Sequence, residues 1–206
     1  MMIELLENDF KITYGLVRNL NVNQIIYSTD FSLHDPKACN NCPEKDTCNQ
    51  QVAIFICEGK DATVIEYEDF INSLQGTKAG EGKKCDCIVY TSDNGKFILN
   101  EQSCSKQQYI ESERGKRATA VCQFNETITK LYRVNNIKDY IQKYSQCIGL
   151  FTYRLKDLNG ESTGLVENSM NNFFKPLKFG PVISQEDTLN EHFTFIQVIY
   201  PGEYEL

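Results

Sequence analysis

The chain has 206 residues, of which 41% are hydrophobic and 24% charged, proportions that are typical of a soluble globular protein. Its formal net charge of −7 does not favour unspecific binding to a polyanion such as nucleic acid. No apolar run approaches the roughly 18 residues that cross a bilayer, and the acidic N-terminus lacks the basic segment of a secretory signal. We therefore expect a cytoplasmic protein with no membrane partner.

The length suits a single domain over residues 1–206 with one buried core. Residues 2–33 carry short apolar runs without helical spacing, which predict short strands or an opening helix. A cysteine-rich insertion is expected over residues 34–57; it is polar at first and ends in an apolar run. We expect the core over residues 62–155, followed by C-terminal strands and loops over residues 156–206.

Apolar and β-branched runs predict strands along the chain. They lie at residues 62–67, 85–90, 96–100, 148–155 and 193–200, and residues 52–57 form an apolar run that we expect to be buried. The dipeptide Asn94-Gly95 supplies positive φ at low cost, so it predicts a tight hairpin between the second and the third of these strands.

Helical spacing is clearest over residues 116–133, where apolar positions recur every three or four residues. Shorter helices are expected at residues 68–74 and 167–174. Residues 76–82 contain three glycines and are expected to form a flexible connector.

Two acidic residues flank the predicted hairpin. Asp86 lies at the start of its first strand and Glu101 at the end of its second, so the turn brings the two carboxylates together. Two oxygen ligands a few ångströms apart suit Mg²⁺, which keeps several waters and takes one or two protein carboxylates. Such an ion can lower the pKa of a water molecule and stabilise charge on a phosphodiester. The pair therefore predicts a catalytic metal site.

Residues 84–133 resemble the core of the PD-(D/E)xK nuclease superfamily. The resemblance is carried by Lys84-Cys85-Asp86, the hairpin, the run 97–101 that ends in Glu101, and the basic helix with Gln123. It implies an α/β fold of the restriction-endonuclease-like type, with a mixed central sheet flanked by helices. It also implies a phosphodiesterase that uses Mg²⁺ or Mn²⁺ at Asp86 and Glu101.

The superfamily usually places a lysine two residues after the second acid, where this chain has Ser103. Some members carry that lysine on the following helix, and Lys116 is our candidate for it. Lys116, Gln123 and Lys130 are each seven residues apart, about two helical turns, so they share one face. Many relatives carry a glutamine there, which assigns Gln123 to the support of the site. An acid from the preceding helix often completes the site, and Glu68 is our candidate.

Residues 106–143 hold eight basic and four acidic side chains, a net charge of +4 on an otherwise acidic chain. Such a segment suits either a local phosphate-binding face or docking onto an acidic partner. We expect nucleic acid as one partner, with a protein partner or a homo-oligomer in addition. The candidate nucleic-acid-binding residues are Lys106, Arg114, Arg117, Lys130 and Arg133.

Three cysteines in the polar loop, Cys39, Cys42 and Cys48, have the spacing C-x2-C-x5-C. Thiolates this close repel one another unless a soft metal neutralises them, which predicts a metal site. The fourth ligand is His34 or Cys57, and we favour His34 because Cys57 ends an apolar run. Three cysteines and one histidine would close a tetrahedral structural zinc site.

The same spacing resembles the cysteine triplet of iron–sulfur-containing helicase-nucleases. In those proteins the triplet follows the nuclease core, whereas here it precedes it, so zinc is favoured over an iron–sulfur cluster.

Two functions are consistent with these features. One is a metal-dependent nuclease or nuclease subunit, and by analogy of fold such proteins often act in bacterial defence against phages. The other is a non-catalytic, zinc-stabilised domain that keeps the nuclease fold for binding nucleic acid or a protein partner.

Overall fold

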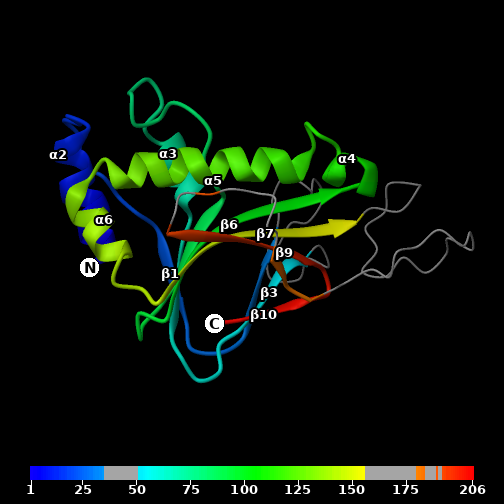
Figure 1. Cartoon of the computed structure of the whole chain (residues 1–206). Coiled ribbons are helices and arrows are strands. Elements are labelled where there is room, and N and C mark those ends of the chain that lie inside the picture. The colour runs from blue at the N-terminus through cyan, green and yellow to red at the C-terminus, as the bar shows by residue number, and fades with distance from the viewer. Residues whose placement is uncertain (35–50, 156–179, 184–188, 190–191) are drawn as a thin grey trace, which may run out of the picture.

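The computed structural model describes residues 1–34, 51–155, 180–183, 189 and 192–206. It contains a layer of helices, a large sheet and a small sheet (Figure 1). The chain opens with a helical segment made of α1 (Met2–Glu4), η1 (Leu5–Phe10) and α2 (Lys11–Thr13). The later helices are α3 (Tyr67–Asn72), α4 (Gln107–Glu111), α5 (Lys116–Tyr132) and α6 (Asn135–Ile141).

The large sheet is mixed. Its strands, in spatial order, are β1 (Gln24–Tyr27), β4 (Ala62–Ile65), β5 (Cys87–Thr91), β6 (Lys96–Ser105), β7 (Gln146–Leu155), β9 (Phe193–Ile199) and β8 (Val182–Ile183). Strands β6, β7 and β9 run parallel to one another, and the other neighbouring pairs are antiparallel. Strand β6 therefore pairs with β5 in an antiparallel hairpin on one side and with the parallel strand β7 on the other.

Helix α5 lies along one face of this sheet, within the crossover between the parallel strands β6 and β7 (Figure 1). Its buried residues Ala120, Phe124, Ile128 and Leu131 recur every three or four positions and pack into the core on that face. The predicted helix over residues 116–133 is therefore confirmed to within one residue at its C-terminus.

The small sheet covers the other face. It consists of β2 (Phe31–His34), β3 (Gln51–Ile56) and β10 (Glu203–Glu205), in the order β10-β3-β2. A second apolar core lies between the two sheets and includes Phe55 of β3, Ile98 of β6 and Leu150 of β7. The apolar run at residues 52–57, at the end of the expected insertion, corresponds to β3, the central strand of this small sheet.

Strand β6 contributes side chains to both cores, because successive residues of a strand point to opposite faces. Leu99 packs with the helices, whereas Ile98 packs with the small sheet. The same alternation directs Glu101 and Ser103 toward α5, and Gln102 toward the small sheet. The candidate acid of β6 therefore lies on the helical side.

The predicted α/β class, with a mixed central sheet flanked by helices, is confirmed. Strand β6 is longer than predicted, because it does not end at Asn100 but pairs with β7 as far as Ser105. Within this extension, Nε2 of Gln102 donates a hydrogen bond of 3.1 Å to Oδ1 of Asn100. Residues 2–33 form both a helix and strands. The helix expected at residues 167–174 lies outside the described residues.

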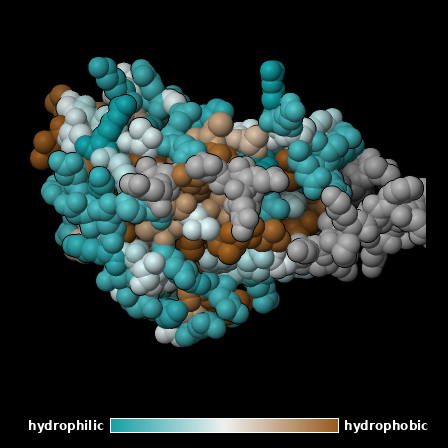
Figure 2. All heavy atoms as spheres, viewed as in Figure 1, coloured by the Kyte–Doolittle hydropathy of each residue, from teal (hydrophilic) through white to brown (hydrophobic). Residues whose placement is uncertain are grey.

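Within the described ranges, no helix has the length and apolar character that a membrane span requires. Figure 2 shows hydrophilic residues over much of the visible surface and hydrophobic ones in the middle of this face.

Candidate functional site

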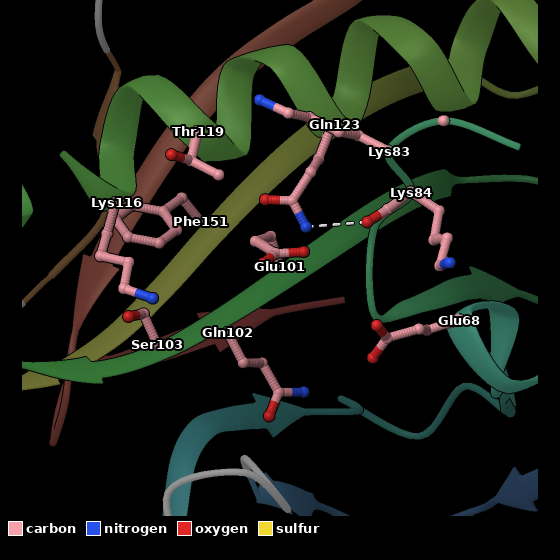
Figure 3. Close-up of a pocket in the computed structure, with 11 residues that line it drawn as sticks. Glu68, Lys83, Lys84, Glu101, Gln102, Ser103, Lys116, Thr119, Gln123 and Phe151 are labelled. Carbon is pink, nitrogen blue, oxygen red and sulfur yellow. Dashed lines mark hydrogen bonds between the residues drawn. The ribbon is translucent and has the colours of Figure 1, made fainter. Parts of the chain in front are cut away.

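A cavity of about 330 Å³ lies between α5, β6 and the segment that precedes β5. Its walls are drawn in Figure 3 and consist of Glu68, Gly82, Lys83, Lys84, Glu101, Gln102, Ser103, Lys116, Thr119, Gln123 and Phe151. Four predicted catalytic residues are among them: Glu68, Glu101, Lys116 and Gln123. The fifth, Asp86, is bound directly to one of the lining residues.

Asp86 and Glu101 lie next to the last residue pair of the β5–β6 hairpin. The register pairs Cys87, which directly follows Asp86, with Asn100, which directly precedes Glu101. The Asp86 carboxylate is held in place, because its Oδ2 accepts a hydrogen bond of 2.7 Å from the N–H of Gln102. The hairpin therefore brings the two predicted acids together.

Besides burial, the negative charges of these two acids help to raise the pKa values of two thiols, those of Cys85 and Cys87. Burial raises the pKa of Cys87 well above its ordinary value, and the charges of Asp86 and Glu101 raise it further. Burial also raises the pKa of Cys85, followed by the effects of Cys87 and Glu101. Both thiols stay protonated near neutral pH, so they pack beside the site and do not serve as nucleophiles.

Glu68 reaches the cavity from the first turn of α3. Its N–H donates a hydrogen bond of 2.9 Å to the carbonyl of Asp86, which ties the start of α3 to the segment before β5. In Figure 3 its carboxylate points into the cavity from the side away from Lys116. Among the residues that the structure describes, no three His, Cys, Asp or Glu side chains form a metal-binding group. Glu68 is therefore not gathered with the other two acids.

Asp86 and Glu101 offer carboxylate oxygens as ligands. This donor set fits Mg²⁺ or Mn²⁺, since such hard cations are often held by one or two carboxylates and complete their coordination with water. It lacks the nitrogen and sulfur ligands of a structural zinc site. The nearby thiol of Cys87 is directed to the other face, where its Sγ lies 3.6 Å from Oδ1 of Asn100.

Lys116 lies in the first turn of α5, and its side chain runs toward Ser103 in Figure 3. Ser103, two residues after Glu101, is buried and lines the same cavity. Gln123 extends from α5 toward the hairpin, and its Nε2 donates a hydrogen bond of 2.8 Å to the carbonyl of Lys84. Lys116 and Gln123 thus share the cavity with Glu101, as the helical spacing predicts.

Lys130 has a different environment from the one expected of a nucleic-acid contact. Its side chain is 8% exposed, and its Nζ donates hydrogen bonds to the carbonyls of Ala79 at 2.8 Å and Glu81 at 2.7 Å. Burial lowers its pKa, and the nearby charge of Lys84 lowers it further. Its ammonium group is used inside the protein, so Lys130 does not belong with the candidate nucleic-acid-binding residues.

The other basic candidates do not form one cluster. Lys106 and Arg114 flank α4, and Arg117 lies at the start of α5 with its guanidinium 5.8 Å from the ring centre of Phe195. Arg133 directly follows α5, about 25 Å from its start at a rise of 1.5 Å per residue.

Two lysines that are not among the predicted site residues line the cavity instead. Lys83 and Lys84 stand on the segment between α3 and β5. The sequence signal for them is the adjacent pair of cations directly before Cys85-Asp86.

Cys39, Cys42 and Cys48 lie outside the described residues. Of the two candidate fourth ligands, His34 is the last residue of β2 and precedes Cys39 by five positions in the sequence. Cys57 is buried, and its Sγ donates a hydrogen bond of 3.1 Å to the carbonyl of Thr29. Burial raises the pKa of Cys57, which disfavours the thiolate that a metal requires. His34 is the better candidate of the two.

No protein-family model matches this chain, and neither does any curated protein or solved structure.

Proposed function

We propose that the chain is a metal-dependent nuclease, or the nuclease subunit of a larger assembly, and that it hydrolyses phosphodiester bonds of nucleic acid. The observation that carries the proposal is the position of Asp86 and Glu101 at the end of one hairpin, beside a cavity that Glu101 lines together with Lys116 and Gln123. The mixed sheet flanked by helices agrees with the restriction-endonuclease-like type that the resemblance implies.

In this proposal Asp86 and Glu101 hold a Mg²⁺ or Mn²⁺ ion. When bound, the ion supplies a water of lowered pKa and positive charge beside the scissile phosphate. The N–H of Gln102 keeps the Asp86 carboxylate in position to bind it. Lys116 places a second positive charge at the cavity, where it stabilises the negative charge that develops on the phosphate oxygens in the transition state.

Two further residues position this machinery. Gln123 holds the carbonyl of Lys84, and therefore the segment that leads into Asp86. Glu68 binds the carbonyl of Asp86 through its own N–H, and its carboxylate faces the cavity, where it can orient the attacking water.

The direct test is a cleavage assay with labelled single- and double-stranded DNA and RNA. We expect cleavage in Mg²⁺ or Mn²⁺, none in EDTA, and none with Asp86→Asn or Glu101→Gln. Asp139→Asn is the matched control, because Asp139 is an exposed acid on α6 and does not line the cavity. Cleavage that survives both site substitutions would refute the site.

One observation favours a second function. Ser103 stands in the place of the superfamily lysine, so the domain could bind nucleic acid or a partner without cleaving it. This alternative predicts that calorimetry detects no Mn²⁺ binding that depends on Asp86 and Glu101. It also predicts nucleic-acid binding that weakens when Lys116, Arg117 or Arg133 is replaced by alanine.

We also propose a structural zinc ion held by Cys39, Cys42, Cys48 and His34. Only His34 belongs to the described residues, as the last residue of β2. Metal analysis of the purified protein should find zinc in a colourless sample, and His34→Ala should lower the zinc content. A brown sample that absorbs visible light would indicate an iron–sulfur cluster instead.

A further inference from the structure

The segment between α3 and β5 is attached to α5 through its main chain. Four α5 side chains, at the spacing of one helical face, hold it. Lys130 donates to the carbonyls of residues 79 and 81, and Gln123 donates to the carbonyl of residue 84. Glu126 accepts from the N–H of Lys83 at 2.6 Å, and Thr127 accepts from the N–H of Cys85 at 3.1 Å. We call residues 79–85 the clamped segment.

Two glycines allow the clamped segment to lie this close to its neighbours. Gly82 has a φ of +79°, and a Cβ there would stand 2.6 Å from Oε2 of Glu126. A Cβ at Gly80 would stand 2.3 Å from the carbonyl oxygen of Leu74. The predicted flexible connector is therefore a fixed wall of the cavity, and its glycines serve close approach.

This wall presents two cations to the cavity. Lys83 is exposed and Lys84 is half-buried, and both line the cavity that contains Glu101. In Figure 3 the Lys83 side chain extends along α5, whereas that of Lys84 points toward Glu68. Lys116 contributes a third cation from the start of α5. The three lysines thus line the cavity from two different elements.

We propose that Lys83 and Lys84 form a phosphate-binding subsite beside the metal-binding carboxylates. The identity of its ligand, a nucleic-acid strand, rests on the proposed function. The scissile phosphate lies between the carboxylate pair and Lys116, and the clamped segment binds a neighbouring phosphate of the same strand. Because the contacts go to the backbone, the subsite fixes the strand without reading its sequence.

The fixed main chain matters for this role. A mobile loop would have to be ordered at each binding event, which costs affinity. Here the hydrogen bonds from α5 have already ordered it. The two lysines then need only their own side chains to reach the phosphate.

The test measures binding separately from cleavage. Glu101→Gln serves as the background, and the fluorescence anisotropy of a short labelled oligonucleotide is followed over a range of salt concentrations. Lys83→Ala/Lys84→Ala should weaken binding about tenfold for different sequences alike, and should reduce the slope of log affinity against log salt by about 1.4 for a single strand. The matched control is Lys78→Ala/Lys143→Ala, two exposed lysines that do not line the cavity.

Competition identifies the ligand. An unlabelled oligonucleotide should displace the probe at far lower concentration than inorganic phosphate or a mononucleotide, since those offer one phosphate-bearing group only. Equal potency of inorganic phosphate would overturn the assignment to a strand.

The failure of the subsite and the failure of the proposed function are distinguishable. The subsite is refuted if the double variant binds the oligonucleotide as tightly as Glu101→Gln alone, or if it loses no more affinity than the Lys78→Ala/Lys143→Ala control. This holds even where the wild type cleaves. If the wild type neither cleaves nor binds Mn²⁺ but loses oligonucleotide affinity in the double variant, the subsite stands and the nuclease is refuted.

Discussion

The two halves of α5 carry polar side chains on one face but use them differently. In the first half, Lys116 and Gln123 line the cavity, and Gln123 also binds the carbonyl of Lys84 at the end of the clamped segment. Glu126 and Lys130, in the second half, bind the main chain of the same segment. The difference lies in what covers the helix, because the clamped segment crosses the second half and leaves the start of the first half, with Lys116, open. Helical spacing tells which side chains share a face, but only the tertiary structure decides which of them remain available to a ligand.

The largest expected effect concerns the open half. Lys116→Ala should lower the cleavage rate by about a hundredfold, because it removes one preorganised positive charge from the transition state. The midpoint of urea unfolding should stay unchanged, since Lys116 is exposed. A variant that unfolds much earlier than the wild type would show that Lys116 belongs with the structural half of the helix.

In the covered half the effect should appear in stability. Lys130→Met keeps the length of the side chain but removes the donor to two carbonyls, so we expect the free energy of unfolding to fall by about 2 kcal/mol. Lys143→Met, at an exposed position, should change it by less than about 0.5 kcal/mol. Urea unfolding followed by circular dichroism measures both, and equal effects would remove the distinction between the two lysines.

A smaller effect is expected where α5 meets the end of the clamped segment. Thr127→Val leaves the N–H of Cys85 without its hydrogen bond, which should cost about 1 kcal/mol. Local opening should then let a thiol reagent reach Cys85, which is fully buried in the wild type. Cys122 is exposed on α5 and provides the internal reference, since it should react rapidly in both proteins. Mass spectrometry of labelled peptides reads out both sites.

The smallest effect is a pH dependence. Burial lowers the pKa of Lys130 in the folded protein, so the unfolded chain keeps this proton to higher pH than the folded one. By linkage, this group makes stability rise as the pH increases from the lowered pKa toward the ordinary lysine value of about 10.4. The difference in unfolding free energy between the wild type and Lys130→Met should therefore grow in that window. A constant difference would show that the ammonium is better solvated than its burial indicates.

Much of the fold is predictable from local signals. Asn94-Gly95 marks the hairpin, and the apolar spacing over residues 116–133 marks α5. The continuation of β6 beyond Asn100 has no such signal, because polar residues in a strand are tolerated only when distant partners satisfy them. Asn100 finds one in the carbonyl of Leu150, fifty positions away in the sequence. At Cys122 a local signal misleads. Its neighbours in the sequence are apolar, which suggests burial, but the structure exposes this side chain.

The candidate site also combines residues that local signals predict with residues that only the tertiary structure brings to the cavity. Asp86 and Glu101 are predictable because a single turn joins them, and Lys116 follows from its place on the next helix. Lys83 enters the cavity only because its N–H is bound by Glu126, forty-three positions away. A glycine-rich segment also resembles a loose linker in sequence, whereas here its glycines permit close packing.

The hydrogen bonds from α5 that hold the clamped segment end on its amide and carbonyl groups. An exposed position such as Glu81 should therefore accept many other residues, provided that Gly80 and Gly82 are kept. The path of the main chain is set by its hydrogen bonds to α5, whereas the side chains at its exposed positions can be changed independently. In most loops these two properties depend on the same residues. A library of substitutions at these positions could retune the charge around the cavity without rebuilding the domain.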